Sequence, residues 1–274
     1  VLFQNFIDFD ILFSIDMTLP PDLTPLSQIE SNQEHILAIK RNDLLPLLND
    51  THRLNSYADH LVQAQCVLLK GVDPKLNQQL SDVITQIIQQ LSASKKYLGG
   101  RRFNALQKWL GIDVEYDAGQ IKYVKDLDHL ISEANHLSQR LQIEIQKSQS
   151  RLQQVLGLRT QMAAYIQAAD EFLAEYPQFS KQPALDHFVE RLSKKINTLQ
   201  TLQTSNDIAM KQMQLSQNLS FSLLDRFKEA QQVLIPAWQY YLEQSRESHS
   251  MARLDQLDKS REELIQKLKK SLQK

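Results

Sequence analysis

The stretch YVKDLDHLISEANHLSQRLQIEIQKSQSRLQQVLGL, from Tyr123 to Leu158, has apolar residues at every third or fourth position. This spacing is typical of one face of an α-helix, and it lies close to the heptad pattern of packed helix pairs. The repeat continues through Met162 to Phe172, and it predicts a single helix over residues 118–176. Such a helix is on the order of 90 Å long at 1.5 Å per residue.

A second apolar stripe follows a short break in the first. The break, EYPQFSKQPA, contains Pro177 and Pro183, which end one helix and favour the start of the next. The second stripe carries Leu185, Phe188, Leu192, Ile196, Leu199, Leu202, Met210, Met213, Leu224, Phe227 and Leu234. Two helices of similar length joined in this way are expected to fold back antiparallel, with the tip near residues 177–183.

Shorter helices are expected on both sides of this hairpin. The apolar spacing predicts helices over residues 26–49, 51–69, 74–98, 103–110 and 250–274, with a turn at IDVEYDAG, residues 112–119. Pro46 is expected to kink or end the first of them. No strand pattern of quality occurs after residue 17, so we predict an all-α, elongated bundle built on a long antiparallel, coiled-coil-like hairpin with shorter N-terminal helices.

The chain divides into four expected segments. Residues 1–16 precede Met17 and begin with VLFQ, which matches the end of a common protease-cleavage tag; we expect them to be wholly or partly non-native, or else a native apolar segment. The other segments are an N-terminal helical segment over 17–111, the hairpin over 112–249, and a C-terminal amphipathic basic helix over 250–274.

Composition excludes several classes of protein. The 274 residues carry a net charge of −1, so no overall field attracts nucleic acid, and no nucleic-acid partner is expected. No apolar run reaches the roughly 18 residues of a membrane-spanning helix. The single cysteine, Cys66, cannot form an intramolecular disulfide and is expected to be a small core residue.

The chemistry-bearing residues form no recognisable catalytic or metal-binding motif. His129 and His136 can share a helix face, but no further ligand completes a metal site, and no metal or cofactor is expected. The carboxylates of Asp170, Glu171 and Glu175 have no arrangement that suggests acid–base catalysis. We therefore expect no enzymatic activity.

Two basic regions leave alternatives open. Arg101 and Arg102 follow a double glycine, and they either bind an anion with the N–H groups of the next helix or form a solvated helix start. Residues 259–274, KSREELIQKLKKSLQK, combine six basic residues with leucines on one face. Such a helix either contacts an anionic membrane surface or an acidic partner, or is a solvated helix of the bundle.

The segment QNLSFSLLDRFKEAQQVLIPAW, from Gln217 to Trp238, contains a proline inside a helical pattern. Pro236 lacks an N–H and would clash with the carbonyl of residue 232, so a bend is expected there. The bend would turn Trp238 and Tyr241 toward the bundle or toward a partner. We take Asn218, Pro236, Trp238 and Tyr241 as a candidate partner-binding corner, with a purely structural kink as the alternative.

This segment resembles the C-terminal signature of the TelA-like toxic-anion-resistance (tellurite-resistance) family. Gln217 and Asn218 stand at its Gln-Asn element, while Ile235, Pro236 and Trp238 stand at its Ile-Pro-aliphatic-Trp element; Ala237 replaces the usual bulkier residue. The resemblance covers roughly residues 75–245 and supplies no catalytic residues. It implies a cytoplasmic bacterial protein of a resistance or stress-response system, with peripheral contact to the inner membrane left open.

Two functions from different classes follow. The first is a non-enzymatic helical interaction protein, or scaffold, that binds protein partners. The alternative is direct binding of an oxyanion or anionic metabolite through Arg101 and Arg102.

Overall fold

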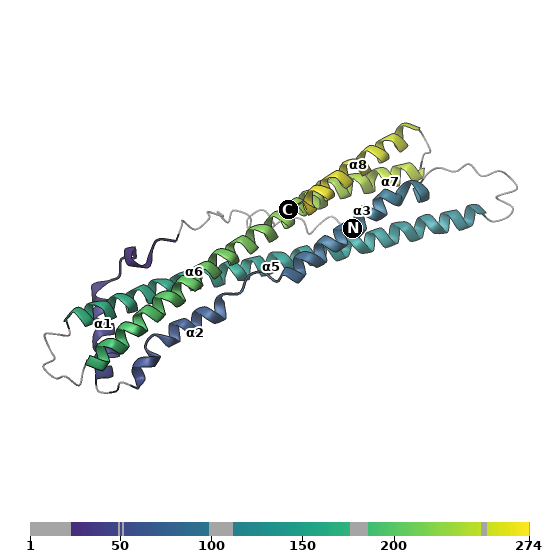
Figure 1. Cartoon of the computed structure of the whole chain (residues 1–274). Helices are drawn as coiled ribbons and strands as arrows, with labels where there is room; N and C mark the ends of the chain where they lie inside the picture. The colour runs from purple at the N-terminus through teal and green to yellow at the C-terminus, as the bar shows by residue number, and fades with distance from the viewer. Residues whose placement is uncertain are drawn as a thin grey trace, which may run out of the picture. The chain divides into compact units, whose positions relative to one another are not determined.

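A computed structural model describes residues 23–48, 50, 52–98, 112–175, 186–247 and 251–273 (Figure 1). Across these ranges every regular element is helical and no strand occurs, so the all-α prediction is confirmed. The contacts group the described residues into two compact units. Unit 1 takes its residues from Val1–Val62 and Leu158–Asp207, and unit 2 takes its residues from Gln63–Gly157 and Ile208–Lys274.

Two long helices, α5 and α6, supply residues to both units. Helix α5 is Ile112–Glu175, with 64 residues, and α6 is Asp186–Glu229, with 44 residues. The predicted turn at 112–119 is wrong, because α5 already begins at Ile112. A single glycine costs a helix only about 1 kcal/mol. That cost is too small for Gly119 to interrupt so long a helix.

The two long helices run antiparallel within each unit. In unit 1, the rings of Phe172 and Phe188 have centroids 6.3 Å apart, and Arg159 donates a hydrogen bond to Asp207. In unit 2, Ser148 of α5 is hydrogen-bonded to Gln217 of α6, and Gln142 accepts a hydrogen bond from Lys228. Within each unit, contacts earlier in α5 pair with contacts later in α6, as an antiparallel arrangement requires. The predicted tip, residues 177–183, lies outside the described residues.

The first predicted helix, 26–49, is wrong as a single element. A 3₁₀ turn, η1, occupies Leu26–Gln28, and α1 begins only at Gln33 and ends at Ile39. The side chain of Asn32 starts α1 by accepting a hydrogen bond of 2.9 Å from the N–H of Glu34. A π-turn, η2, then covers Lys40–Leu44, and a 3₁₀ turn, η3, covers Leu45–Leu48 and contains Pro46.

The second predicted helix, 51–69, is also divided. A 3₁₀ turn, η4, occupies Arg53–Ser56, and α2 runs over Asp59–Leu68. Between them Ala58 has a φ of 59°, which is a left-handed conformation. This conformation is unfavourable for any residue that carries a Cβ atom. Cys66 lies on α2 but is exposed, so its predicted place in the core is wrong. The buried face of α2 carries Leu61 and Gln65 instead.

Helix α3 matches its prediction closely. It runs over Pro74–Leu98, and the side chain of Asp73 accepts a hydrogen bond of 3.0 Å from the N–H of Lys75. Asp73 therefore caps the helix, and proline occupies its first position, where no N–H is needed.

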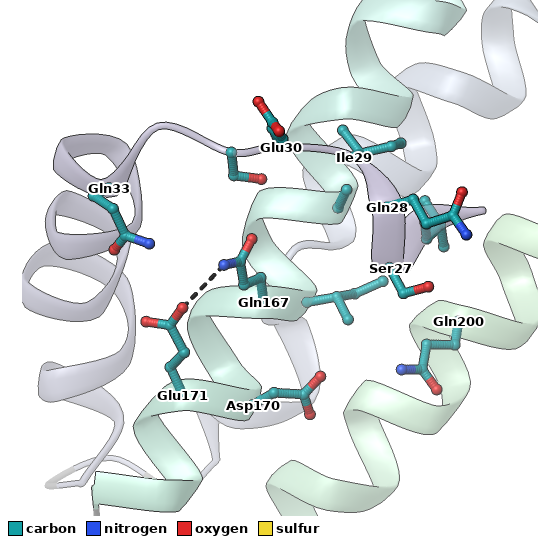
Figure 2. A pocket seen from close by; sticks show the side chains of 13 residues that line it. Ser27, Gln28, Ile29, Glu30, Gln33, Gln167, Asp170, Glu171 and Gln200 are labelled. Atoms are coloured by element: carbon teal, nitrogen blue, oxygen red, sulfur yellow. Dashed lines mark hydrogen bonds between the residues drawn. The ribbon is translucent and has the colours of Figure 1, made fainter. Parts of the chain in front are cut away.

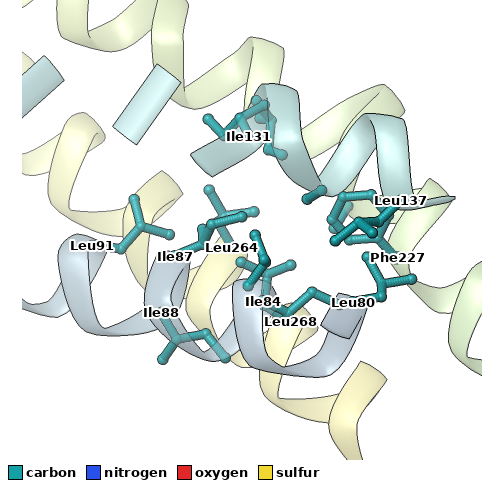
Figure 3. Close-up of a cluster of buried hydrophobic side chains, with 14 of the residues drawn as sticks. Leu80, Ile84, Ile87, Ile88, Leu91, Ile131, Leu137, Phe227, Leu264 and Leu268 are labelled. Atoms are coloured by element: carbon teal, nitrogen blue, oxygen red, sulfur yellow. The ribbon is translucent and has the colours of Figure 1, made fainter. Parts of the chain in front are cut away.

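The core of unit 2 combines five helices (Figure 3). Helices α3, α5 and α6 are joined there by α7, Ile235–Glu247, and α8, Met251–Leu272. Side chains that meet in this core include Leu80, Ile84, Ile87, Leu91, Ile131, Leu137, Phe227, Leu264 and Leu268. The core of unit 1 is built by α1, the turns that follow it, α2 and the facing parts of α5 and α6.

Several expectations fall on residues that the structure does not describe. These are the leader, residues 1–16, the short helix at 103–110, and the expected segment boundaries at 111 and 249. They stay predictions.

Candidate functional site

The Gln-Asn element of the signature lies on α6, and its two residues face opposite environments. Gln217 is buried, and its Nε2 donates a hydrogen bond of 2.8 Å to Oγ of the buried Ser148 on α5. Asn218 is exposed and is flanked by the exposed side chains of Leu215 and Leu219. Gln217 therefore belongs to the packing of unit 2, and Asn218 belongs to its surface.

A π-turn lies directly before Pro236 and accommodates the proline within the helix. The turn, η7, covers Ala230–Leu234, and the N–H of Ile235 donates to the carbonyl of Ala230, five residues earlier. A π-turn adds one residue to a helix, which relieves the clash between a proline ring and the carbonyl four residues before it. Pro236 then lies in the first turn of α7, directly after the widened part of the helix.

Beyond the π-turn, α7 alternates buried and exposed aromatic residues. Trp238 is 1% exposed and packs in the unit 2 core, while Tyr241 is partly buried against that core. The Nε1 of Trp238 has no hydrogen-bond partner among the described residues. Tyr240 points outward and is 55% exposed. The segment thus directs Trp238 inward and Tyr240 outward.

Three exposed residues share one side of this segment. Val233, Pro236 and Tyr240 follow the i, i+3, i+7 spacing of a helix face, and all three are exposed. We call these three residues the corner face. Asn218 lies eighteen positions before Pro236, roughly 27 Å along the helix at 1.5 Å per residue. The structure therefore does not bring Asn218 to the corner face.

Unit 1 contains a charged cluster that periodicity does not reveal. Lys40, in the π-turn η2, is buried, and its Nζ donates to Glu171 at 2.7 Å and to Glu175 at 2.9 Å. Both carboxylates lie one turn apart on α5. Burial lowers the pKa of Lys40, but the two carboxylates outweigh it and leave that pKa above its ordinary value. The Lys40 hydrogen bond lowers the pKa of Glu171. The structure thus gives these carboxylates a common partner that the sequence did not indicate.

A second polar cluster in unit 1 joins two tyrosines to the same π-turn. The hydroxyl of Tyr57 donates a 2.8 Å hydrogen bond to the carbonyl of Tyr165, and the hydroxyl of Tyr165 donates to Asp43 at 3.3 Å. The ring of His60 stands edge-on to that of Tyr165. Burial raises the pKa of both tyrosines. These side chains and Arg53 line a small cavity of about 220 Å³. Ala58 also lines it, and its positive φ is a local backbone feature of this site.

The basic tail is integrated into unit 2. Leu264 and Leu268 of α8 are buried in the core, and Arg261 is also buried, donating to Oγ of Ser94 at 3.2 Å. Lys269 and Lys270 are exposed. The amphipathic pattern of 259–274 therefore corresponds to a helix of the bundle. Its contact with a membrane stays a prediction.

The remaining residues considered in the sequence are two arginines and two histidines, and anion binding by Arg101 and Arg102 stays a prediction. Arg101 and Arg102 lie outside the described residues. His129 and His136 are exposed on α5, and no group of three metal-ligating side chains occurs among the described residues. None of the described helices is long and apolar enough to cross a membrane.

These features define a class: an all-α protein built on two long antiparallel helices, whose second helix is interrupted by a π-turn before a proline. The chain is similar to protein KlaA of Escherichia coli, with 31% identity over 169 residues. The match covers 59% of this chain and 65% of KlaA, so the chain spans less than two thirds of that relative. No family model matches the chain. No solved structure matches it either.

Proposed function

We propose that this chain is a non-enzymatic helical interaction protein of a bacterial toxic-anion (tellurite) resistance or stress-response system, and that it acts in the cytoplasm. The signature at residues 217–238 supports the system, and the similarity to KlaA is compatible with it at the level of the family. The observation that carries the interaction role is the corner face. It is an exposed apolar surface on the segment that bears the resemblance.

The corner face is held in a defined position, which favours a binding surface. The adjacent Trp238 is locked in the unit 2 core, and the π-turn is closed by the bond between Ile235 and Ala230. A preorganised surface binds at lower entropic cost than one that must order itself. Valine, proline and tyrosine side chains offer apolar area, and tyrosine is enriched at protein interfaces.

The test is a resistance assay on a double variant, Val233→Ser with Tyr240→Ser. We expect growth on tellurite and recovery of the bound partner to fall, while the thermal midpoint hardly changes because both side chains are exposed. The matched control is Val67→Ser with Ile143→Ser, two exposed apolar residues of unit 2 outside the corner face. Full resistance in the corner-face variant, or equal loss in the control, would contradict the proposal.

A further inference from the structure

A cavity in unit 1 lies between the N-terminal segment and the two long helices (Figure 2). Its volume is about 640 Å³, within the range of small-molecule sites. Residues 26–31 and Gln33 form one wall, α5 forms a second, and Gln200 of α6 lies opposite. Leu26, Ile29 and Ile166 add apolar surface to this lining.

The charged residues of the lining are all acidic. Glu30, Asp170 and Glu171 line the cavity, and no lysine or arginine does. Glu171 is already paired with Lys40, which lies outside the lining, and it accepts a hydrogen bond from Gln167 at 3.0 Å. A lining with uncompensated carboxylates favours a cationic ligand and disfavours an anion.

Of the two carboxylates that α5 contributes to the lining, Glu171 is paired and Asp170 is not. It makes no hydrogen bond or ion pair with any other described residue, although surrounding protein raises its pKa by desolvation. Its carboxylate is accessible from the cavity, and Figure 2 shows it directed toward Gln200. A carboxylate in such surroundings is stabilised by an opposite charge that it can contact directly.

Polar side chains add further acceptors to the lining. Gln200 is exposed on α6, and Ser27 and Gln28 are exposed on the N-terminal wall. The cavity therefore offers several acceptors beside a small apolar wall.

We propose that this cavity binds a small aliphatic amine, with Asp170 as the counter-ion of its ammonium group. An ammonium has three donors, and the side-chain oxygens of Asp170 and Gln200 can accept two of them. The alkyl part lies against Leu26 and Ile29. The ammonium group of Lys40 is bound in a similar way by the carboxylates of Glu171 and Glu175. This inference is independent of the proposed interaction role.

The experiment is calorimetric titration of the full chain with n-butylamine at neutral pH. We expect binding to the wild type and a loss of about tenfold or more in affinity for Asp170→Asn, because a charge-assisted hydrogen bond is lost. Glu133→Gln, which changes an exposed carboxylate of α5 in unit 2, is the matched control and should bind like the wild type. 1-Butanol and tellurite should not bind at this cavity, since one lacks the charge and the other has the wrong sign.

Thermal unfolding provides a second readout. The amine should raise the midpoint of the wild type and of Glu133→Gln, and should raise that of Asp170→Asn much less. Unperturbed midpoints without ligand would show that Asp170→Asn is folded. The proposal is overturned if n-butylamine does not bind, if Asp170→Asn binds it as tightly as the wild type, or if 1-butanol binds equally well.

Discussion

The π-turn of unit 1 and the π-turn of unit 2 precede a proline by the same number of residues, yet they hold different side chains. Lys40–Leu44 comes before Pro46, and Ala230–Leu234 comes before Pro236, with one residue between turn and proline in each case. In both, the carbonyl that would meet the proline ring lies inside the widened turn. The backbone therefore handles both prolines in the same way.

What differs is the role of the side chains. The turn of unit 1 presents Lys40 and Asp43 to polar partners on α5. In the turn of unit 2 only Ala230 is buried, and the helix continues into α7 and its core residue Trp238. One backbone solution thus serves a charged cluster in one unit and an apolar anchor in the other. Four variants test this contrast.

The largest effect is expected at the apolar anchor. Trp238→Ala should lower the free energy of unfolding by about 3–5 kcal/mol, because it empties a fully buried site of unit 2. Chemical denaturation measures this loss. Tyr240→Ala, at an exposed position of the same helix, should change stability by less than about 0.5 kcal/mol. Equal losses in the two variants would mean that α7 is not anchored by its tryptophan.

The second variant removes the extra residue of the π-turn. Deleting the exposed Gln232 should return the helix to regular α-geometry and bring the proline ring against a carbonyl, a cost of about 3 kcal/mol. Adding Pro236→Ala to the deletion should restore most of the lost stability, because the clash disappears. Both are measured by denaturant unfolding. Without such a rescue, the π-turn would not be an accommodation of proline.

The third variant addresses the charged cluster of unit 1. Lys40→Met should cost about 2 kcal/mol, since it removes charge-assisted hydrogen bonds and leaves two carboxylates side by side. Lys194→Met, at an exposed position of α6, should have little effect. A loss no larger than that of this control would show that the cluster contributes nothing to stability.

The same variant should change how the free energy of unfolding falls at low pH. Lys40 holds the pKa of Glu171 below the ordinary value of 4.5, so the native state loses stability as pH falls through that region and below it. We expect a shallower decline of the unfolding free energy below about pH 4.5 in Lys40→Met. An identical slope in both proteins would contradict the pairing.

The smallest effect is expected at the tyrosine cluster. Tyr57→Phe should cost about 1 kcal/mol, the value of one buried hydrogen bond to a carbonyl. Burial raises the pKa of Tyr57, so its neutral form stabilises the fold below about pH 10, and this stability is lost as pH rises further. Alkaline unfolding should therefore be less steep in Tyr57→Phe than in the wild type or in Tyr240→Phe.

The sequence predicted the features that depend on apolar periodicity and on helix-capping residues. The apolar stripes of α5 and α6 and the Asp73-Pro74 start of α3 are visible in the order of residues, and the structure contains them. Where the sequence predicts a bend at Pro236, the structure has a π-turn before the proline. Adding one residue to a helix leaves the apolar spacing on each side intact. Periodicity alone does not distinguish a kink from such a turn.

Contacts between residues far apart in the chain leave no pattern in the sequence. Lys40 and Glu171 are separated by 131 positions, so only the fold brings them together. Arg261 stands in a charge-rich tail that reads as solvated, yet it is buried. The predicted turn at 112–119 is wrong because α5 continues through Gly119, and the predicted core place of Cys66 is wrong because α2 turns this residue outward.

The buried pair of Gln217 and Ser148 has a consequence for how the hairpin finds its alignment. Along the unit 2 parts of α5 and α6 most buried positions are apolar, and a slide by one turn or one heptad would exchange one apolar contact for another at most of them. The same slide would separate Gln217 from Ser148 and leave both without a partner in an apolar interior. A buried polar pair penalises such alternatives even when it adds little to the free energy of the correct one. The pair therefore favours one alignment of α5 and α6 within unit 2.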